Sequence, residues 1–392
     1  KSEKKMTTTK KSVIVAVSML MTGVGFADTI TWTGEGLDHL WSTKENWDKG
    51  RIPANGDIVS ITKPLDSVAI TNDIEGLSLD YIVLSSDAEN QRILTLAGKP
   101  LTLTTTLYAI QGNGTEVVTN DVEMTATSCQ YMRFNNVVML APLHLQSASI
   151  QFYDSTGTRY SGGVFYGAVD APDTTIRLSS DNVKFYGPFN VKLIKTDESY
   201  GLNCCFYGQA ERSGEIQVAR YMDCRMYSAN TLGPNVVLSF SGTVHNSPLA
   251  HYLYGNQTID RVVSAATTYA GRNVVKQMSG GTNVLTMRGS DNAWASVVFE
   301  GGMGLVWDPT GDFTQTFADQ ASTCTGNIEV RRGTLESAGK NTFKSVSKLI
   351  VARNATFKIS ASEANAAVNP FKAGIAAEIG SGGVIDVAEN VT

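Results

Sequence analysis

The sequence predicts an all-β protein that folds as a right-handed parallel β-helix, a solenoid with a tryptophan-rich cap at its N-terminal end. Three observations support this fold: short alternating strands bounded by turn residues, a near-constant interval of about twenty residues between repeats, and three tryptophans gathered before the first strand. The 392 residues include 36 glycines and only 18% charged side chains, a composition typical of many short strands joined by turns.

Residues 1–27 are predicted to be a secretory signal peptide. Lys10 and Lys11 precede an apolar run over residues 13–24, and small residues then allow cleavage after Ala27. The alternative, a membrane-spanning helix, needs about 20 apolar residues, whereas this run has roughly a dozen. We therefore expect export to the outer membrane and cell surface or to the extracellular medium, and no membrane span in the mature chain.

The mature chain is predicted to contain an N-terminal cap segment, residues 28–57, followed by a β-helix over residues 58–392. Alternating runs bounded by Gly, Pro, Asn or Asp predict the first short strands at residues 58–62, 67–70, 77–84, 93–96 and 101–103. No segment of about a dozen residues carries the apolar stripe of an amphipathic helix. We expect the β-helix to be incomplete at Thr392, where the strand pattern is still running.

Phe-Tyr pairs recur at Tyr153, Tyr166, Tyr186 and Tyr207, the last three at intervals of twenty and twenty-one residues, with an irregular echo at Tyr254. One turn of a solenoid gives such an interval, and equivalent residues of successive coils then stack roughly 4.8 Å apart. The pairs therefore predict two ladders, one facing inward and one facing outward. An array of β-sandwiches is the alternative, but the turns do not alternate as those of hairpins with Asn-Gly signals would.

The five cysteines are too few and too scattered for a disulfide-dense scaffold. They contain no Cys-x-x-Cys pair, and the four histidines do not cluster near them, so we expect no zinc site, no other metal and no cofactor. Cys205 and Cys224 lie about one coil apart and are predicted to stack. Such a pair is either a buried apolar ladder or, in an oxidising compartment, a disulfide.

Two stretches resemble bacterial surface proteins of the autotransporter passenger type. The first contains Trp32, Gly34, Leu-Trp-Ser at residues 40–42, Asn-Trp at residues 46–47, Gly50, Pro53 and Gly56-Asp57 before an aliphatic strand. It is similar to the motif that opens the mature part of exported β-helical proteins with autotransporter-associated β-strand repeats. The second resembles degenerate copies of that repeat, at Gly326-Asn327-Ile328, Gly333-Thr334-Leu335 and Ala355-Thr356-Phe357. The resemblance implies a β-helical surface protein and leaves its anchoring route open.

Trp32, Trp41 and Trp47 are the candidate functional residues of the N-terminal segment. The open end of a solenoid exposes strand edges that pair with other chains unless a cap covers them, and three indoles are large enough to cover the first coil. Tryptophan faces also stack on sugar rings, so a carbohydrate platform is the alternative interpretation.

The sequence predicts a structural or adhesive protein with no catalysis, acting as a monomer on a polysaccharide or on a host or neighbouring cell. The net charge of −5 argues against nucleic acid as a partner. The alternatives are a polysaccharide lyase or glycoside hydrolase on the same fold, which needs two carboxylates about 5 to 10 Å apart, and a carbohydrate-binding protein without turnover. Asp170 and Asp173, on either side of Pro172, are interpreted as turn residues.

Overall fold

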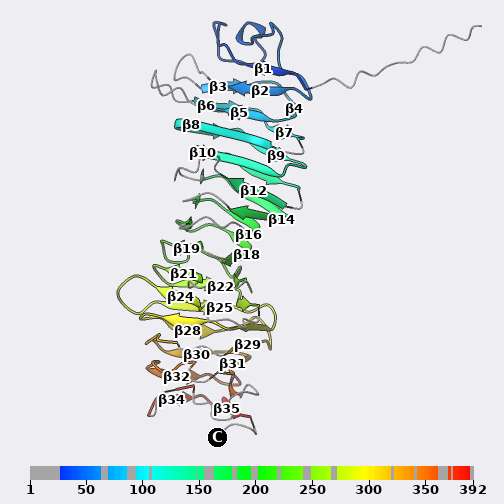
Figure 1. Ribbon diagram of the computed structural model, residues 1–392. Helices are drawn as coiled ribbons and strands as arrows, with labels where there is room; N and C mark the ends of the chain where they lie inside the picture. The colour runs from blue at the N-terminus through cyan, green and yellow to red at the C-terminus, as the bar shows by residue number, and fades with distance from the viewer. Residues whose placement is uncertain are drawn as a thin grey trace, which may run out of the picture.

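The computed structural model describes residues 27–62, 69–85, 94–105, 108–147, 149–153, 163–178, 183–195, 202–218, 222–241, 249–265, 272–318, 322–339, 342–360, 370–371 and 374–388. Within these ranges the only helix is a 3₁₀ turn, η1 (Lys44–Asn46). The strands stack along one long axis, with the N-terminal loops above β1 at one end and β34 and β35 at the other (Figure 1). The predicted all-β parallel solenoid is confirmed. The predicted signal peptide, apart from Ala27, lies outside the described residues.

Three columns of parallel strands form the faces of the solenoid. The first face contains β1 (Thr29–Thr31), β2 (Ile58–Ile61), β5 (Ile82–Leu84), β12 (Ser149–Tyr153), β20 (Asn235–Phe240), β23 (Val262–Ser264), β26 (Ala293–Ala295), β29 (Thr314–Phe317), β31 (Thr334–Ser337), β33 (Thr356–Ile359) and β35 (Val384–Val387). The second contains β3 (Ala69–Asn72), β6 (Leu94–Gly98), β13 (Val164–Phe165), β15 (Val183–Phe185), β17 (Leu202–Phe206), β19 (Met222–Met226), β21 (Leu249–Leu253), β24 (Asn273–Gln277) and β27 (Val298–Glu300).

The third face contains β4 (Ser78–Leu79), β7 (Leu101–Leu103), β9 (Met124–Ala126), β11 (Leu143–Leu145), β22 (Gln257–Ile259), β25 (Val284–Met287), β28 (Gly304–Trp307), β30 (Ile328–Val330), β32 (Lys348–Val351) and β34 (Ala376–Ile379). Five longer strands turn a corner and serve two faces: β8 (Tyr108–Asp121), β10 (Tyr131–Met139), β14 (Val169–Leu178), β16 (Phe189–Lys195) and β18 (Arg212–Val218). β20 does the same, since Asn235 and Val236 continue the third face before the strand joins the first. The chain crosses the three faces in turn before it starts the next coil.

The alternation of side chains within each short strand creates the core. Strands such as β5 and β7 bury their first and last residues and half-expose the middle one, because successive side chains point to opposite faces of a strand. Since neighbouring coils pair in parallel and in register, an inward residue in one coil stacks on an inward residue of the next. The apolar inward residues from β1 to β33 therefore form one continuous core along the axis, whereas the residues of β34 and β35 are exposed.

The Phe-Tyr pairs of the second face form the two predicted ladders. Phe165, Phe185 and Phe206 are buried, and their rings stack with centroids 5.2 and 5.5 Å apart. Five outward tyrosines stack with centroids 4.6 to 4.9 Å apart, namely Tyr166, Tyr186, Tyr207, Tyr227 and Tyr254. The prediction of one inward and one outward ladder is confirmed. Phe152 lies in β12 on the first face, yet its buried ring stacks on Phe165 with the centroids 5.6 Å apart, so it extends the inward ladder from the neighbouring face. The side chain of Tyr153 lies outside the described part.

Glycine follows Tyr166 and Tyr186 because the next corner has no room there for a side chain, whereas Gly208 after Tyr207 has open space and a positive φ of 64°. A Cβ at Gly167 would lie 2.1 Å from the carbonyl oxygen of Ala141, and one at Gly187 would lie 2.3 Å from that of Tyr166. The backbones of successive coils thus touch directly at this corner, and the close approach keeps the tyrosines stacked.

We predict that Phe185→Ala lowers the free energy of unfolding by about 3–5 kcal/mol, because it leaves a cavity in the inward ladder. Urea titration followed by far-UV circular dichroism measures the loss. Lys184→Ala is the matched control on the outward side of the same strand, and we expect it to change stability by less than about 0.5 kcal/mol. Equal stability of the two variants would contradict the inward assignment.

Candidate functional site

The three N-terminal tryptophans pack together above the first coil. Trp32, Trp41 and Trp47 are 4%, 0% and 3% exposed. Trp47 contacts both neighbours edge-to-face, with ring centroids 5.1 Å from Trp32 and 5.5 Å from Trp41. Its indole N–H donates to the carbonyl oxygen of Trp41 at 2.9 Å. The tryptophans form the predicted cap, and the sugar-stacking alternative does not fit, because no indole face is open to a ligand.

The cap also covers the strand edges of the first coil. The N–H of Trp32 donates to Ser60 of β2, and the N–H of Trp41 donates to Thr71 of β3. Asn46 is fully buried beneath this loop, accepting from the N–H of Gly36 at 2.8 Å and donating to the carbonyl oxygen of Leu40 at 3.0 Å. Backbone N–H and C=O groups at a strand edge that are already hydrogen-bonded cannot pair with a strand of another chain. A cap protects the end of a solenoid in this way.

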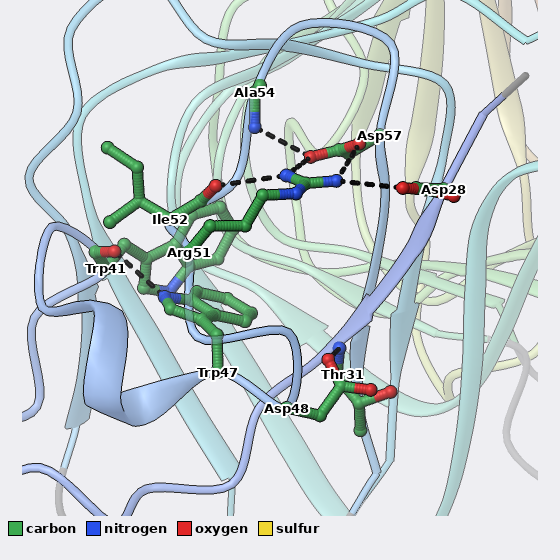
Figure 2. A network of polar contacts seen from close by, with 9 residues as sticks. All are labelled: Asp28, Thr31, Trp41, Trp47, Asp48, Arg51, Ile52, Ala54 and Asp57. Atoms are coloured by element: carbon green, nitrogen blue, oxygen red, sulfur yellow. Dashed lines mark hydrogen bonds and ion pairs between the residues drawn. The ribbon is translucent and has the colours of Figure 1, made fainter. Parts of the chain in front are cut away.

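An ion pair fixes the turn that leads from the cap into the solenoid (Figure 2). Arg51 donates to both carboxylate oxygens of Asp57, the longer bond being 2.9 Å, and reaches Asp28 at 3.3 Å. The N–H of Ala54 adds a further bond to Asp57 at 2.8 Å. Burial pushes the pKa of Asp57 upward, but the bonds from Arg51 and Ala54 outweigh it and hold the pKa below its usual value.

A groove lined by both apolar and polar residues runs along the third face, on the middle part of the shaft. It has a volume of about 950 Å³ and extends from His144 on β11 to Asn235 at the start of β20. One outward residue per coil forms its floor, in the register His144, Asp170, Asn190, Ser213 and Asn235. Four coil steps give the groove a length of about 19 Å. The interpretation of Asp170 as a turn residue was wrong, since it lies within β14; the side chain of Asp173 is outside the described part.

The floor residues bond to one another along the axis. The Asn190 amide donates to Asp170 at 3.4 Å, and the Ser213 hydroxyl donates to Asn190 at 3.0 Å. His144 lies between two carboxylates, with its Nε2 3.3 Å from Glu123 and its Nδ1 3.7 Å from Asp170. The groove thus offers amide, hydroxyl, imidazole and carboxylate groups that bind hydroxyl-rich ligands.

Arg212 forms the base of the groove and ties three coils together. It is 3% exposed, and its guanidinium donates to the carbonyl oxygens of Thr231, of Tyr207 at 3.0 Å and of Tyr186 at 3.2 Å. Its side chain also lies over the Phe189 ring, 5.8 Å from the centroid. Burial lowers the pKa of Arg212 to about 10. An arginine at an inward position therefore holds the corner through backbone carbonyl groups.

A second hollow of about 480 Å³ continues the groove along the same face. It shares Pro234 and Asn235 with the first and is otherwise lined by Thr258, Asp260, Arg288, Ser290 and Thr310. Asp260 accepts from the backbone N–H of Ser290 at 2.7 Å and from its hydroxyl at 2.9 Å, so it is fixed in place. The continuous hollow surface therefore spans more coils than the first groove alone.

The predicted stacking of Cys205 on Cys224 needs correction. Register places Cys224 opposite Cys204, while Cys205 lies opposite Arg225. Successive residues point to opposite sides of a strand, so Cys204 and Cys224 face the core and Cys205 faces outward. All five cysteines are free thiols in this structure.

Sequence reasoning identified the cap but missed the groove and Arg212. The sequence does carry a signal for Arg212. It occupies one of the alternate, inward-facing positions of its strand, as the buried Ile216 and Val218 do, and an arginine is unexpected there.

No helix in the described part of the chain is long and apolar enough to cross a membrane. Comparisons of the chain with protein families, curated proteins and solved structures found no match.

We predict that Trp41→Ala lowers the free energy of unfolding by about 3–5 kcal/mol, because the indole is fully buried in the cap. Hydrogen exchange should show the loss first in β1 and β2. Leu37→Ala, in the same loop but fully exposed, is the control and should leave protection unchanged. Unaltered exchange in the Trp41 variant would mean that the indole does not support the first coil.

We predict that Asp57→Asn destabilises the protein by about 1–3 kcal/mol at pH 6, because the neutral amide cannot accept both bonds from Arg51. The pKa of Asp57 is lower in the folded than in the unfolded chain. Its contribution is therefore complete above the unfolded pKa, about 3.9, and is lost as pH falls through the folded pKa.

The difference between wild type and Asp57→Asn should accordingly shrink between pH 5 and pH 2 in urea titrations. Glu45→Gln, which removes an exposed pair with Lys44, is the control and should cause little change at either pH. A difference that stays constant with pH would show that the carboxylate charge is not what stabilises the turn.

Proposed function

We propose that this protein is an exported, elongated structural and adhesive protein whose shaft binds an extended polysaccharide along the third face. The observation that carries the proposal is the groove floor, which presents one outward residue per coil over about 19 Å. A linear polymer of repeating units suits such a site, because its units meet polar side chains at regular steps.

The chemistry of the floor favours a sugar polymer over a charged one. Asn190, Ser213 and Asn235 are neutral groups that both donate and accept hydrogen bonds, which matches the hydroxyl groups of a polysaccharide. Asp170 and Glu211 bring negative charge to the same groove, and Arg212 brings positive charge. This mixed lining gives no single-sign field of the kind that attracts nucleic acid.

Location outside the cell is proposed on the sequence of the N-terminal region. The predicted signal peptide directs export, and the motif from Trp32 to Asp57 resembles the opening of autotransporter passengers. In that setting the cap isolates one end of the shaft, and the shaft presents the groove at a distance from its anchor. The protein would act through adhesion without chemical turnover.

A carbohydrate-active enzyme is the second candidate, favoured by two acidic residues in the groove. Asp170 and Glu211 both line it and lie two coil steps apart, about 10 Å along the axis. Glu211 is also offset by two residues from the position opposite Asp170, so the two Cα atoms lie about 12 Å apart. The side chains would have to lean toward each other to reach the roughly 6.5–9.5 Å between the carboxyl groups of inverting glycoside hydrolases. Incubation with binding polysaccharides, followed by a reducing-sugar assay, distinguishes the enzyme from the adhesin.

We predict that Asn190→Trp weakens polysaccharide binding at least tenfold, because a bulky side chain would fill the middle of the groove. Affinity electrophoresis in gels containing neutral plant and microbial polysaccharides measures the retardation. Gln217→Trp adds the same bulk to the first face of the neighbouring coil and should bind as wild type does.

Either of two results would overturn the groove as the binding site: no retardation in any polysaccharide, or equal retardation of the two tryptophan variants. Release of reducing ends by wild type, lost in both Asp170→Asn and Glu211→Gln, would instead establish the hydrolase.

A further inference from the structure

The core of the second face contains a pair of cysteines that lie directly opposite each other. Cys204 on β17 and Cys224 on β19 are register partners, and they are 1% and 0% exposed. His251 on β21 is the next residue of the same inward ladder and is also fully buried. No activity proposed for the groove uses these side chains.

We propose that Cys204 and Cys224 form a disulfide that joins two successive coils when the protein folds in an oxidising environment. The bond would be a covalent modification site within the core, separate from the groove. Its occurrence outside the cell rests on the proposed export, whereas its chemistry can be tested on the purified chain.

Backbone geometry favours this pair over any other. Register partners in adjacent strands lie about 4.8 Å apart, within the roughly 4.4–6.8 Å between Cα atoms that a disulfide requires. Both Cβ atoms point into the core from directly opposite positions, so the two sulfur atoms are neighbours in the same inward ladder. Cys205 points to the opposite side, between Lys184 and Arg225, so it cannot reach Cys224 without turning its strand over.

The surroundings of Cys224 prepare it as the attacking thiolate. Burial raises its pKa, but the neighbouring Cys204 thiol and His251 outweigh burial and hold the pKa below that of an ordinary thiol. Nε2 of His251 lies 3.2 Å from the carbonyl oxygen of Ser239, so we assign the ring proton to Nε2. Nδ1 is buried without a hydrogen-bond partner among the described residues, which leaves its lone pair for the Cys224 proton.

The reaction is a thiol–disulfide exchange with an external small-molecule disulfide such as oxidised glutathione. The Cys224 thiolate attacks one sulfur of that disulfide and displaces a thiolate. The Cys204 thiol then loses its proton and attacks the Cys224 sulfur of the mixed disulfide, displacing the second thiolate. Two protein thiols are oxidised, the two displaced thiolates take up the two protons that these thiols lose, and one external disulfide is thereby reduced to two thiols. Because the finished core excludes solvent, the bond forms while these coils are folding, after β17, β19 and β21 have paired and before the core closes over them.

The other two cysteines lack such a partner and are predicted to stay reduced. Burial raises the pKa of Cys129 and of Cys324 to about 12, so neither is a thiolate at neutral pH. The thiolate is the species that attacks a disulfide. The proposal therefore expects a single bond in a chain of five cysteines.

The test is to refold the full chain from the reduced, denatured state in a glutathione redox buffer. After acid quenching, free thiols are alkylated in denaturant, and the chain is cleaved with trypsin without reduction. Cleavage after Lys195, Arg212, Arg220 and Arg225 puts Cys204 and Cys205 on one peptide and Cys224 on another. We expect these two peptides to be linked, and three alkylated thiols to remain.

Two matched variants identify the bonded residue. Cys205→Ala should keep the link, whereas Cys204→Ala should lose it and leave every remaining thiol free. Circular dichroism confirms that each variant has refolded, and alanine suits both positions because it is small. For wild type we also expect reduction to lower the melting temperature by roughly 2–8 °C, since the bond closes a loop of about twenty residues.

Three results would overturn the proposal. These are five alkylated thiols in refolded wild type at every glutathione ratio, a link that survives Cys204→Ala, or a link that disappears in folded Cys205→Ala. Failure of polysaccharide binding would leave this result unaffected, because the thiol measurement uses no ligand. Conversely, an absent bond would not alter the groove experiment.

Discussion

The fold depends on one constraint: successive coils must stay in parallel register, so that each residue has an equivalent neighbour above and below. Three features follow from this stacking: the pairing of successive strands, the inward phenylalanine ladder and the outward tyrosine ladder. A shift of one residue would exchange the two ladders and bury the tyrosines. The hydrophobic gain of the core therefore fixes the position of every outward group, including those of the groove.

Corners are where this register is most easily lost, and the protein stabilises them in two ways. At Gly167 and Gly187 the backbones touch, so the coil spacing is set by direct contact. Where the chain needs more room, Arg212 fills the inside of the corner and bonds to carbonyl groups of several coils. Burying a cation without a carboxylate partner is costly, and the carbonyl oxygens and the Phe189 ring offset that cost. The same side chain then forms the base of the groove, so the support of the fold and the shape of the site are coupled.

Much of this architecture was predictable from sequence, because a repeat interval near twenty residues leaves few alternatives to a solenoid. The cap was predictable too, since Trp32, Trp41 and Trp47 are concentrated before the first strand. The sequence could not tell which side of its strand an individual residue faces. Cys205 and Cys224 differ by nearly one repeat, yet they face opposite sides; Tyr227 follows methionine and was overlooked although it stacks in the tyrosine ladder. The groove was missed because its floor residues are chemically unlike one another, and only register aligns them.

Register also explains why a weak site on a solenoid can still hold a polymer. Each floor residue offers one or two hydrogen bonds, and a single such bond contributes about 0.5–1.5 kcal/mol net. The contacts are spaced at fixed steps on a rigid core, so once one unit of a chain is bound, the next is held at high effective concentration beside its own contact. Affinity then grows with the number of coils that the polymer crosses, and a short oligosaccharide gains little. A rigid shaft with a shallow groove therefore selects its ligand by chain length more than by the identity of the sugar. Such selectivity suits attachment to a polymer better than capture of a small product.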